Sequence, residues 1–210
     1  MNHRLASLRK VFLLVPAVGI ALAACGEPPQ PGELPASVPQ SAFMERIAGH
    51  CGQAFAGRVV ANEPPPEGAD SFEDQALIMH VRECTEEEIL IPFHVGENRS
   101  RTWVLTDTDA GLRLKHDHRH EDGSDEDVTM YGGDTTSPGS AMRQEFPVDQ
   151  YSIDMFIREG LDVSTTNIWA MEIEPGERFL YELARPGGRL FQVEFDLSEP
   201  VAAPPAPWGH

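Results

Sequence analysis

Residues 111–122 read Gly-Leu-Arg-Leu-Lys-His-Asp-His-Arg-His-Glu-Asp, so the segment begins as an alternating strand and ends as a cluster of histidines and acids. In a β-strand, successive side chains point to opposite faces of the sheet. One face of this strand then carries Leu112, Leu114, His116, His118 and His120. That face changes from apolar to polar halfway along, which is typical of a strand that runs from a core to the mouth of a barrel or cleft.

The run before it, residues 101–107, is also strand-like, and the link Thr108-Asp109-Ala110-Gly111 has turn residues at both ends. The two runs therefore predict a β-hairpin. A four-residue loop places Trp103 opposite His116 and on the histidine face, whereas a loop of odd length pairs the faces the other way. With the even loop, Trp103, His116 and His118 are candidate ligand-binding residues.

Two interpretations of the histidines stay open. Imidazoles at alternate positions of one strand can converge on a divalent transition metal ion, with a nearby carboxylate as a further ligand. The candidate metal ligands are His116, His118, His120, Glu121 and Asp122. In the other interpretation the segment is solvated surface, because neighbouring acids favour the protonated imidazole and so oppose metal binding at neutral pH.

Outward from the hairpin, the chain reads as about ten short strands separated by turn signals. The strand-like segments are residues 54–60, 76–84, 89–95, 101–108, 112–120, 128–131, 142–146, 167–173, 178–184 and 190–197. A helical pattern occupies residues 41–50, with Ser41 as cap and with Phe43, Ile47 and Met44 as an apolar stripe. A second occupies residues 149–159, with Asp149 as cap and with Ile153, Phe156 and Ile157 as its apolar face. Because such a chain closes on itself to remove strand edges, the predicted fold is mainly β: an antiparallel up-and-down β-barrel with one N-terminal and one late inserted helix.

The meander formed by the last three segments resembles the calycin-type barrels, the lipocalins and fatty-acid-binding proteins, although the lipocalin Gly-x-Trp motif is absent from the sequence. The stretch from Leu112 to Gly133 also resembles a group of uncharacterised bacterial lipoproteins. The first resemblance implies a barrel with an interior that can hold a ligand, and the second implies no function.

An N-terminal signal precedes this body. A basic start leads into an apolar run of 14 residues, Val11 to Ala24, which is too short to span a bilayer comfortably. The run ends in Leu22-Ala23-Ala24-Cys25, which resembles the lipobox of bacterial lipoproteins. By that resemblance residues 1–24 are a signal peptide, Cys25 is acylated, for example with palmitate, and the protein is anchored in the cell envelope. Gly26 in place of Asp favours the outer membrane, facing the periplasm; the alternative is an ordinary cleaved secretory signal.

The mature chain divides into three parts. Residues 25–40 are a Pro-rich tether, residues 41–198 form a single barrel domain, and residues 199–210 are rich in Pro and Ala and are expected to be disordered. In an oxidising periplasm Cys51 and Cys84 are expected to form a disulfide. A free or metal-bound pair of thiols is the alternative.

The net charge and the absence of common catalytic and nucleotide-binding motifs limit the classes of function that fit the sequence. The 210-residue chain has a formal net charge of −18, which argues against binding nucleic acid or anionic lipid headgroups by charge. The absence of GxSxG, HExxH, P-loop and dinucleotide-binding patterns favours a non-enzymatic role without excluding an enzyme.

Three functions are compatible with these features. The first is a lipid-anchored barrel that binds a small apolar or amphipathic ligand. The second is a metal-binding barrel, with or without enzymatic activity. It resembles the cupins through His116-x-His118 and Glu121, although the spacing to Glu121 is shorter than the cupin pattern. The third is a structural or interaction protein of the envelope.

Overall fold

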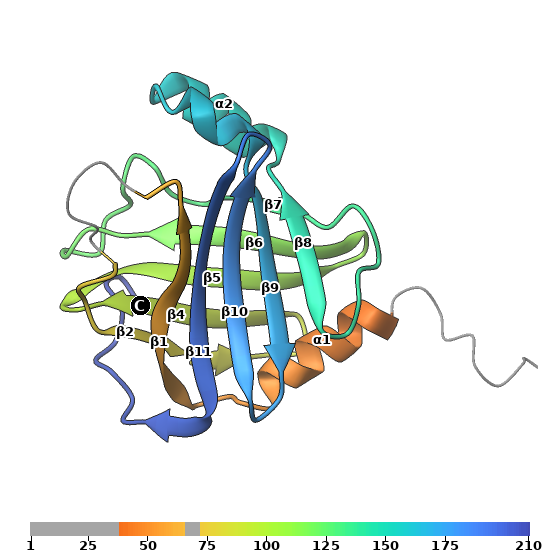
Figure 1. Cartoon of the computed structure of the whole chain (residues 1–210), viewed down its shortest axis with the longest axis vertical. Helices are drawn as coiled ribbons and strands as arrows, with labels where there is room; N and C mark the ends of the chain where they lie inside the picture. Colours follow the sequence, from red (N-terminus) through yellow and green to blue (C-terminus); the bar gives the residue numbers. More distant parts are fainter. Residues whose placement is uncertain (1–37, 66–71) are drawn as a thin grey trace, which may run out of the picture. The chain divides into compact units, whose positions relative to one another are not determined.

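The computed structural model describes residues 38–65 and 72–210, which form a nearly closed antiparallel β-barrel (Figure 1). The strands are β1 (Ala54–Glu63), β2 (Leu77–His80), β3 (Glu83–Cys84), β4 (Glu88–Val95), β5 (Asn98–Thr108), β6 (Gly111–His118), β7 (Tyr131–Asp134), β8 (Arg143–Pro147), β9 (Ile168–Glu174), β10 (Arg178–Arg185) and β11 (Arg189–Val201). The helices are α1 (Val38–Ala48), α2 (Gln150–Arg158) and the 3₁₀ turn η1 (Asp162–Thr166). Neighbouring strands follow the order β7-β6-β5-β4-β2-β1-β11-β10-β9-β8, and β3 pairs with β4. The predicted fold class is confirmed, and the architecture is consistent with a calycin-like barrel.

The central hairpin has the register that the even loop predicts. Trp103 pairs with His116, and Leu105 pairs with Leu114, across β5 and β6. Leu105 and Leu114 are fully buried, and Trp103 and His116 are almost fully buried. The face that carries the histidines is therefore the face that points into the barrel.

One end of the barrel is packed solid. Ile89 of β4, Phe179 of β10 and Val193 of β11 are fully buried there, together with Phe43 and Ile47 of α1. Figure 1 shows α1 at the end of the barrel opposite to α2. The apolar stripe predicted for the first helix is confirmed as its buried face.

The first helix begins earlier than predicted. It starts at Val38, so Ser41 lies inside the helix and does not cap it. Proline is tolerated in the first helical turn because its missing N–H has no partner there in any case, and Pro39 occupies that turn. Within the described residues, no helix has the length and apolar character needed to cross a bilayer.

The barrel closes where its two edge strands, β7 and β8, approach each other. Gly133 and Val148 form an isolated β-bridge at this seam. The Asp149 backbone N–H donates to the Gly132 carbonyl oxygen at 2.9 Å. The buried Ser152 hydroxyl accepts from the Gly132 N–H at 2.8 Å and donates to the Gly132 carbonyl oxygen at 3.1 Å. A side chain of α2 thus completes the hydrogen bonding that a longer strand pair would supply.

The position of β7 differs from the prediction. A strand was expected at residues 128–131, ending at the glycine pair, but β7 begins at Tyr131 and contains both glycines. A Cβ on Gly132 would lie 1.9 Å from the Leu114 carbonyl oxygen, and a Cβ on Gly133 would lie 1.8 Å from the Pro147 carbonyl oxygen. Glycine is needed here because other backbone comes too close for any side chain, and not because the chain turns.

The inserted helix α2 is capped as predicted. The Asp149 carboxylate accepts from the Ser152 backbone N–H at 2.8 Å, and it also pairs with the Lys115 ammonium group on β6. Met155 and Phe156 form the buried face of α2. Ile157, which was predicted to share that face, is 56 % exposed.

The two body cysteines are at disulfide distance. Cys51 follows α1 and Cys84 lies in β3, with their Cα atoms 6.2 Å apart and a bond between their sulfur atoms. The predicted pairing therefore connects the end of α1 to the strand that lies beside β4.

The C-terminal segment 199–210 is ordered, in contrast to the disorder predicted for it. Strand β11 extends into this segment, and the Trp208 backbone N–H donates to the Arg99 carbonyl oxygen at 3.0 Å. The His210 Nε2 atom lies 2.9 Å from an oxygen of the buried Asp117 carboxylate. Proline disfavours a helix, but it does not prevent an extended chain from bonding to the outside of a barrel.

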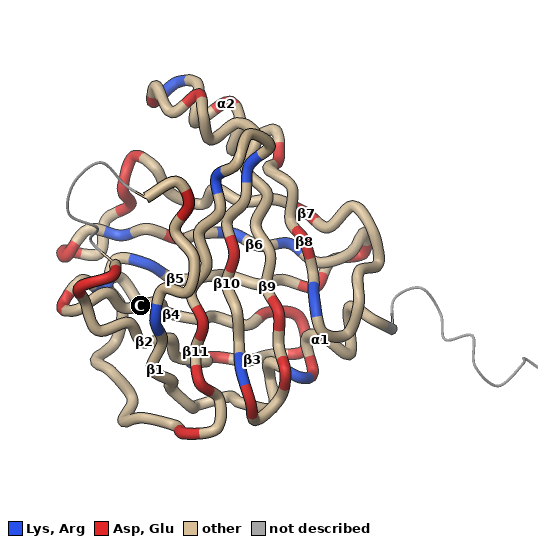
Figure 2. Tube along the Cα trace, in the orientation of Figure 1, with Lys and Arg blue, Asp and Glu red and all other residues tan. Residues whose placement is uncertain are grey.

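Acidic positions recur along β9, β10 and β11, and basic positions lie among them (Figure 2). Arg143 pairs with Glu172 at 2.6 Å and with Glu182 at 2.8 Å, and Arg178 pairs with Glu172 at 2.9 Å. These partners link three neighbouring strands through a charged network on the outside of the barrel.

Candidate ligand-binding cavity

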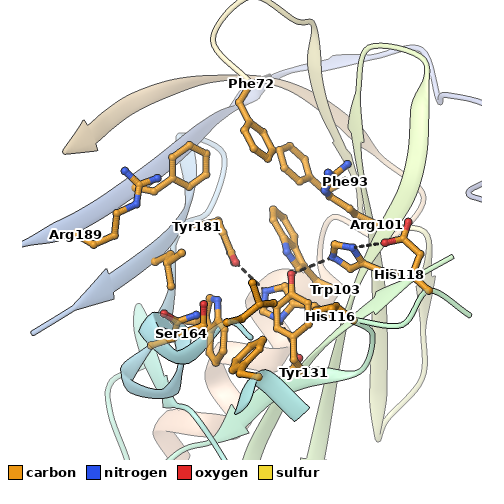
Figure 3. A pocket seen from close by; sticks show the side chains of 18 of the residues that line it. Phe72, Phe93, Arg101, Trp103, His116, His118, Tyr131, Ser164, Tyr181 and Arg189 are labelled. Atoms are coloured by element: carbon orange, nitrogen blue, oxygen red, sulfur yellow. Dashed lines mark hydrogen bonds and ion pairs between the residues drawn. The ribbon is translucent and has the colours of Figure 1, made fainter. Parts of the chain in front are cut away.

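A cavity of about 510 Å³ occupies the end of the barrel that α1 does not fill (Figure 3). Its walls come from seven strands, β4, β5, β6, β7, β9, β10 and β11, from α2 and η1, and from the segments before β2 and β7. The lining residues are Phe72, Phe93, Arg101, Thr102, Trp103, His116, His118, Glu126, Val128, Tyr131, Phe156, Leu161, Ser164, Asn167, Trp169, Tyr181, Leu183, Arg185, Arg189 and Phe191.

Aromatic rings form the fixed wall of the cavity. The Trp103 ring stacks on Tyr181 with centroids 4.5 Å apart and on Phe93 with centroids 5.0 Å apart. Trp103 and Trp169 are at most 2 % exposed. Rings packed against one another have little rotamer freedom, so this aromatic wall is preformed.

His116 lies on this wall with both ring nitrogens engaged. Its Nδ1 is 3.1 Å from the Tyr131 carbonyl oxygen, which can only accept, so Nδ1 carries the hydrogen. Its Nε2 is 2.8 Å from the Tyr181 hydroxyl, which therefore donates to it. The imidazole also stacks on the Tyr131 ring, with centroids 4.6 Å apart and planes 9° apart.

His118 lies two residues further along β6, on the same face, and is also hydrogen-bonded to a tyrosine. The Tyr131 hydroxyl is 3.1 Å from His118 Nε2, and a carboxylate oxygen of Glu126 is 3.6 Å from His118 Nδ1. The hydrogen on the neutral ring faces the carboxylate, so Nε2 accepts from the tyrosine hydroxyl. Figure 3 shows the two histidines and Tyr131 gathered on one side of the cavity.

Burial keeps all four of these groups neutral. Desolvation, followed by the charge of His118, lowers the pKa of His116 to about 3. Desolvation, followed by the charge of Arg101, lowers the pKa of His118 to about 4. Burial raises the pKa of Tyr131 to about 12 and that of Tyr181 well above its ordinary value. At neutral pH the cavity thus offers polar but uncharged imidazole and phenol groups.

The low histidine pKa values predict an acid-sensitive fold. The unfolded chain binds a proton on each histidine as the pH falls below about 6.5, whereas the folded chain does not until about pH 3–4, so folding stability is lost across that window. Each histidine should contribute about 2 kcal/mol of this loss by pH 5. In denaturant titrations, His116→Gln should therefore reduce the stability difference between pH 7 and pH 5 by about 2 kcal/mol.

The matched control for this prediction is His120→Gln, at an exposed position just beyond the same strand. That variant should keep the pH dependence of the wild-type protein. Equal pH dependence in His116→Gln and wild type would contradict the assignment of a neutral, buried His116.

The structure brings together only some of the residues that the sequence singled out. Trp103, His116 and His118 all line the cavity, so the three candidate ligand-binding residues lie at one site. His120, Glu121 and Asp122 follow the end of β6 and are exposed. The five candidate metal ligands do not converge, and the described parts of the chain contain no group of three or more His, Cys, Asp or Glu side chains placed to hold a metal ion.

Most of the residues that line the cavity could not be predicted from the sequence. Tyr131, Trp169 and Tyr181 come from three further strands, and Arg185 and Arg189 flank the turn between β10 and β11. Alternation along residues 178–184 was visible in the sequence and places Tyr181 on one face with Phe179. Which strand that face would meet depends on barrel closure, so the pairing with His116 could not be read from the pattern.

Comparisons with known proteins identify no relative of this chain. The sequence matches no protein-family model, and no match is found among curated proteins or solved structures.

Proposed function

We propose that this chain is a lipid-anchored protein of the bacterial cell envelope, whose barrel binds a small apolar or amphipathic ligand without transforming it. The lipobox-like sequence ending at Cys25, which lies outside the described residues, supports the anchor. The cavity with its preformed aromatic wall is the observation that supports binding.

The size and lining of the cavity fit a small molecule. Ligand sites in proteins commonly enclose roughly 300–1,000 Å³, have mostly apolar walls and carry a few fixed polar groups. The volume here is about 510 Å³, and the polar groups of the wall are held by hydrogen bonds such as the one between His116 and Tyr181. Phe43, Ile89 and Phe179 are fully buried and do not line the cavity, so the barrel has a packed apolar core as well as a hollow.

The state of the polar groups favours binding over catalysis. A general base needs a pKa near the operating pH and a free lone pair directed at its substrate. His116 has a pKa of about 3 and His118 of about 4, and both nitrogens of the His116 ring are already hydrogen-bonded. These groups are suited to orient a ligand by hydrogen bonding.

A neutral aromatic probe tests this function. N-phenyl-1-naphthylamine, whose emission rises in apolar surroundings, should bind the protein saturably at one site. Leu183 lines the cavity on β10, so Leu183→Trp should fill part of the space and weaken binding at least tenfold. Such a loss corresponds to about 1.4 kcal/mol or more of binding free energy.

Val60→Trp is the control, because Val60 is 42 % exposed and does not line the cavity. It adds the same indole elsewhere on the barrel and should leave the affinity unchanged. The proposal fails if the wild-type protein shows no saturable binding, or if Leu183→Trp folds and binds the probe as well as wild type does.

A further inference from the structure

The cavity has the opposite charge balance to the rest of the molecule. The chain carries 34 acidic and 16 basic residues. The residues around the cavity nevertheless include three arginines, Arg101, Arg185 and Arg189, and one carboxylate, Glu126. Glu126 faces His118 at 3.6 Å. This local excess of positive charge in a strongly acidic protein calls for a functional explanation.

The three arginines have neutral hydrogen-bond partners. Arg185 Nε donates to the Asn167 amide oxygen at 2.5 Å, and Arg189 donates to the Asn62 amide oxygen at 2.7 Å. Arg101 donates to the Asn98 amide oxygen at 3.2 Å.

Across residues 38–65 and 72–210, no ion pair joins any of the three arginines to a carboxylate. Most other basic side chains in those ranges do have an acidic partner. These are Arg58, Arg82, Arg113, Lys115, Arg119, Arg143, Arg158 and Arg178. The positive charge at the cavity is therefore left without the compensation that the rest of the barrel provides.

Two of these arginines are held side by side. Arg185 ends β10, Arg189 begins β11, and the two are directly paired across the hairpin turn. Figure 2 shows basic positions at this tip of β10 and β11, next to α2. Burial, followed by the charge of Arg189, lowers the pKa of Arg185. The two like charges repel each other, and an anion bound between them would relieve that repulsion.

Arg101 stands across the cavity from Arg189, and its guanidinium lies over the Phe72 ring at 5.5 Å from the ring centroid (Figure 3). Its charge lowers the pKa of His118 and opposes the rise in the pKa of Tyr131. Arg101 thus places a positive charge near His118 and Tyr131, in addition to the two charges at the hairpin turn.

We propose that the ligand of this cavity is an aromatic organic anion. Its flat body packs on the wall formed by Trp103, Tyr181 and Trp169, and its acidic group, a carboxylate or sulfonate, binds between Arg185 and Arg189. Guanidinium groups suit this role because their planar donor fork matches the oxygens of such acids. This inference rests on the proposed function, because it names the chemical class of the molecule that the cavity binds.

A pair of probes with one ring system separates charge from shape. 8-Anilino-1-naphthalenesulfonate has the aromatic body of N-phenyl-1-naphthylamine plus one sulfonate. Arg185→Gln/Arg189→Gln in the full chain should weaken binding of the sulfonate probe at least tenfold and change binding of the neutral probe less than twofold. A charge-assisted hydrogen bond of ordinary strength is sufficient for this loss.

The control variant is Arg58→Gln/Arg158→Gln, which changes the net charge equally at arginines whose side chains are 75 % and 62 % exposed. It should leave both affinities unchanged. If the neutral probe binds wild type and the cavity double variant lowers neither affinity, or lowers both equally, the anion proposal is overturned while the binding function stands. If neither probe binds wild type saturably, both proposals fall.

Discussion

Gly133→Ala is expected to lower the free energy of unfolding by about 3 kcal/mol or more, which is at or above the usual cost of overpacking. The new methyl carbon would lie 1.8 Å from the Pro147 carbonyl oxygen and 2.7 Å from the Pro147 carbonyl carbon. Both are backbone atoms and cannot rotate away as a side chain would. Gly133 does not have a positive φ, so alanine adopts its backbone conformation without strain and the cost reports the clash alone.

The clash falls on the seam between β7 and β8, where Gly133 bridges to Val148. Separating these strands would also displace Tyr131, whose carbonyl oxygen holds the His116 ring. Urea unfolding followed by circular dichroism measures the effect. Gly49→Ala is the control, because its Cβ would meet nothing nearer than 3.4 Å, and a loss in Gly133→Ala no larger than the control's would show that the seam is not closely packed.

The second large effect is expected from Cys51→Ala/Cys84→Ala, which should lower the free energy of unfolding by about 3–4 kcal/mol. The bond joins residues 33 positions apart, and closing a loop of that length removes substantial conformational entropy from the unfolded chain. The bond also holds the end of α1, whose Phe43 and Ile47 fill the solid end of the barrel. Loss of the bond should therefore loosen that end first.

Reduction with dithiothreitol provides the matching measurement on the unmodified chain. The reduced wild type and the double variant should unfold at the same urea concentration, because both lack only the cross-link. A double variant as stable as the oxidised wild type would show that the disulfide adds nothing to folding.

Much of the barrel could be predicted because its strands, turns and helix cap depend on short local patterns in the sequence. Alternating side chains at 101–108 and 112–120 with a short turn between them fix a hairpin, and an even loop then decides that Trp103 faces His116. The late helix could be predicted because Asp149 has the chemistry of a cap and Ile153, Phe156 and Ile157 follow at helical spacing, although only Phe156 of these three is buried. These features depend on residues a few positions apart.

The remainder depends on contacts between distant segments. The glycine pair at 132–133 reads as a turn, and only the approach of the Leu114 and Pro147 carbonyl groups explains its place inside a strand. The composition of the tail predicts disorder, but the partners of Trp208 and His210 are Arg99 and Asp117, about a hundred residues away. No pattern in the segment itself contains that information.

Only the part of the candidate site that lies on one strand could be predicted, because the other residues come from distant segments. His116 and His118 were identified because they share a strand face, and both reach the cavity. The third histidine shares that periodicity, but the strand ends at His118, so His120 follows a different path and is exposed. Tyr181 and the two hairpin arginines join the site only when β10 and β11 complete the barrel.

The position of the indole side chains gives the protein a built-in optical signal. Of the three tryptophans in the chain, Trp103 and Trp169 line the cavity, whereas Trp208 lies in the C-terminal segment bonded to Arg99. Intrinsic emission therefore comes largely from the two rings that a ligand would touch. In a Trp208→Phe variant all of the tryptophan emission would come from Trp103 and Trp169. An unlabelled natural extract could then be screened for the ligand by the quenching or spectral shift that it causes in this emission.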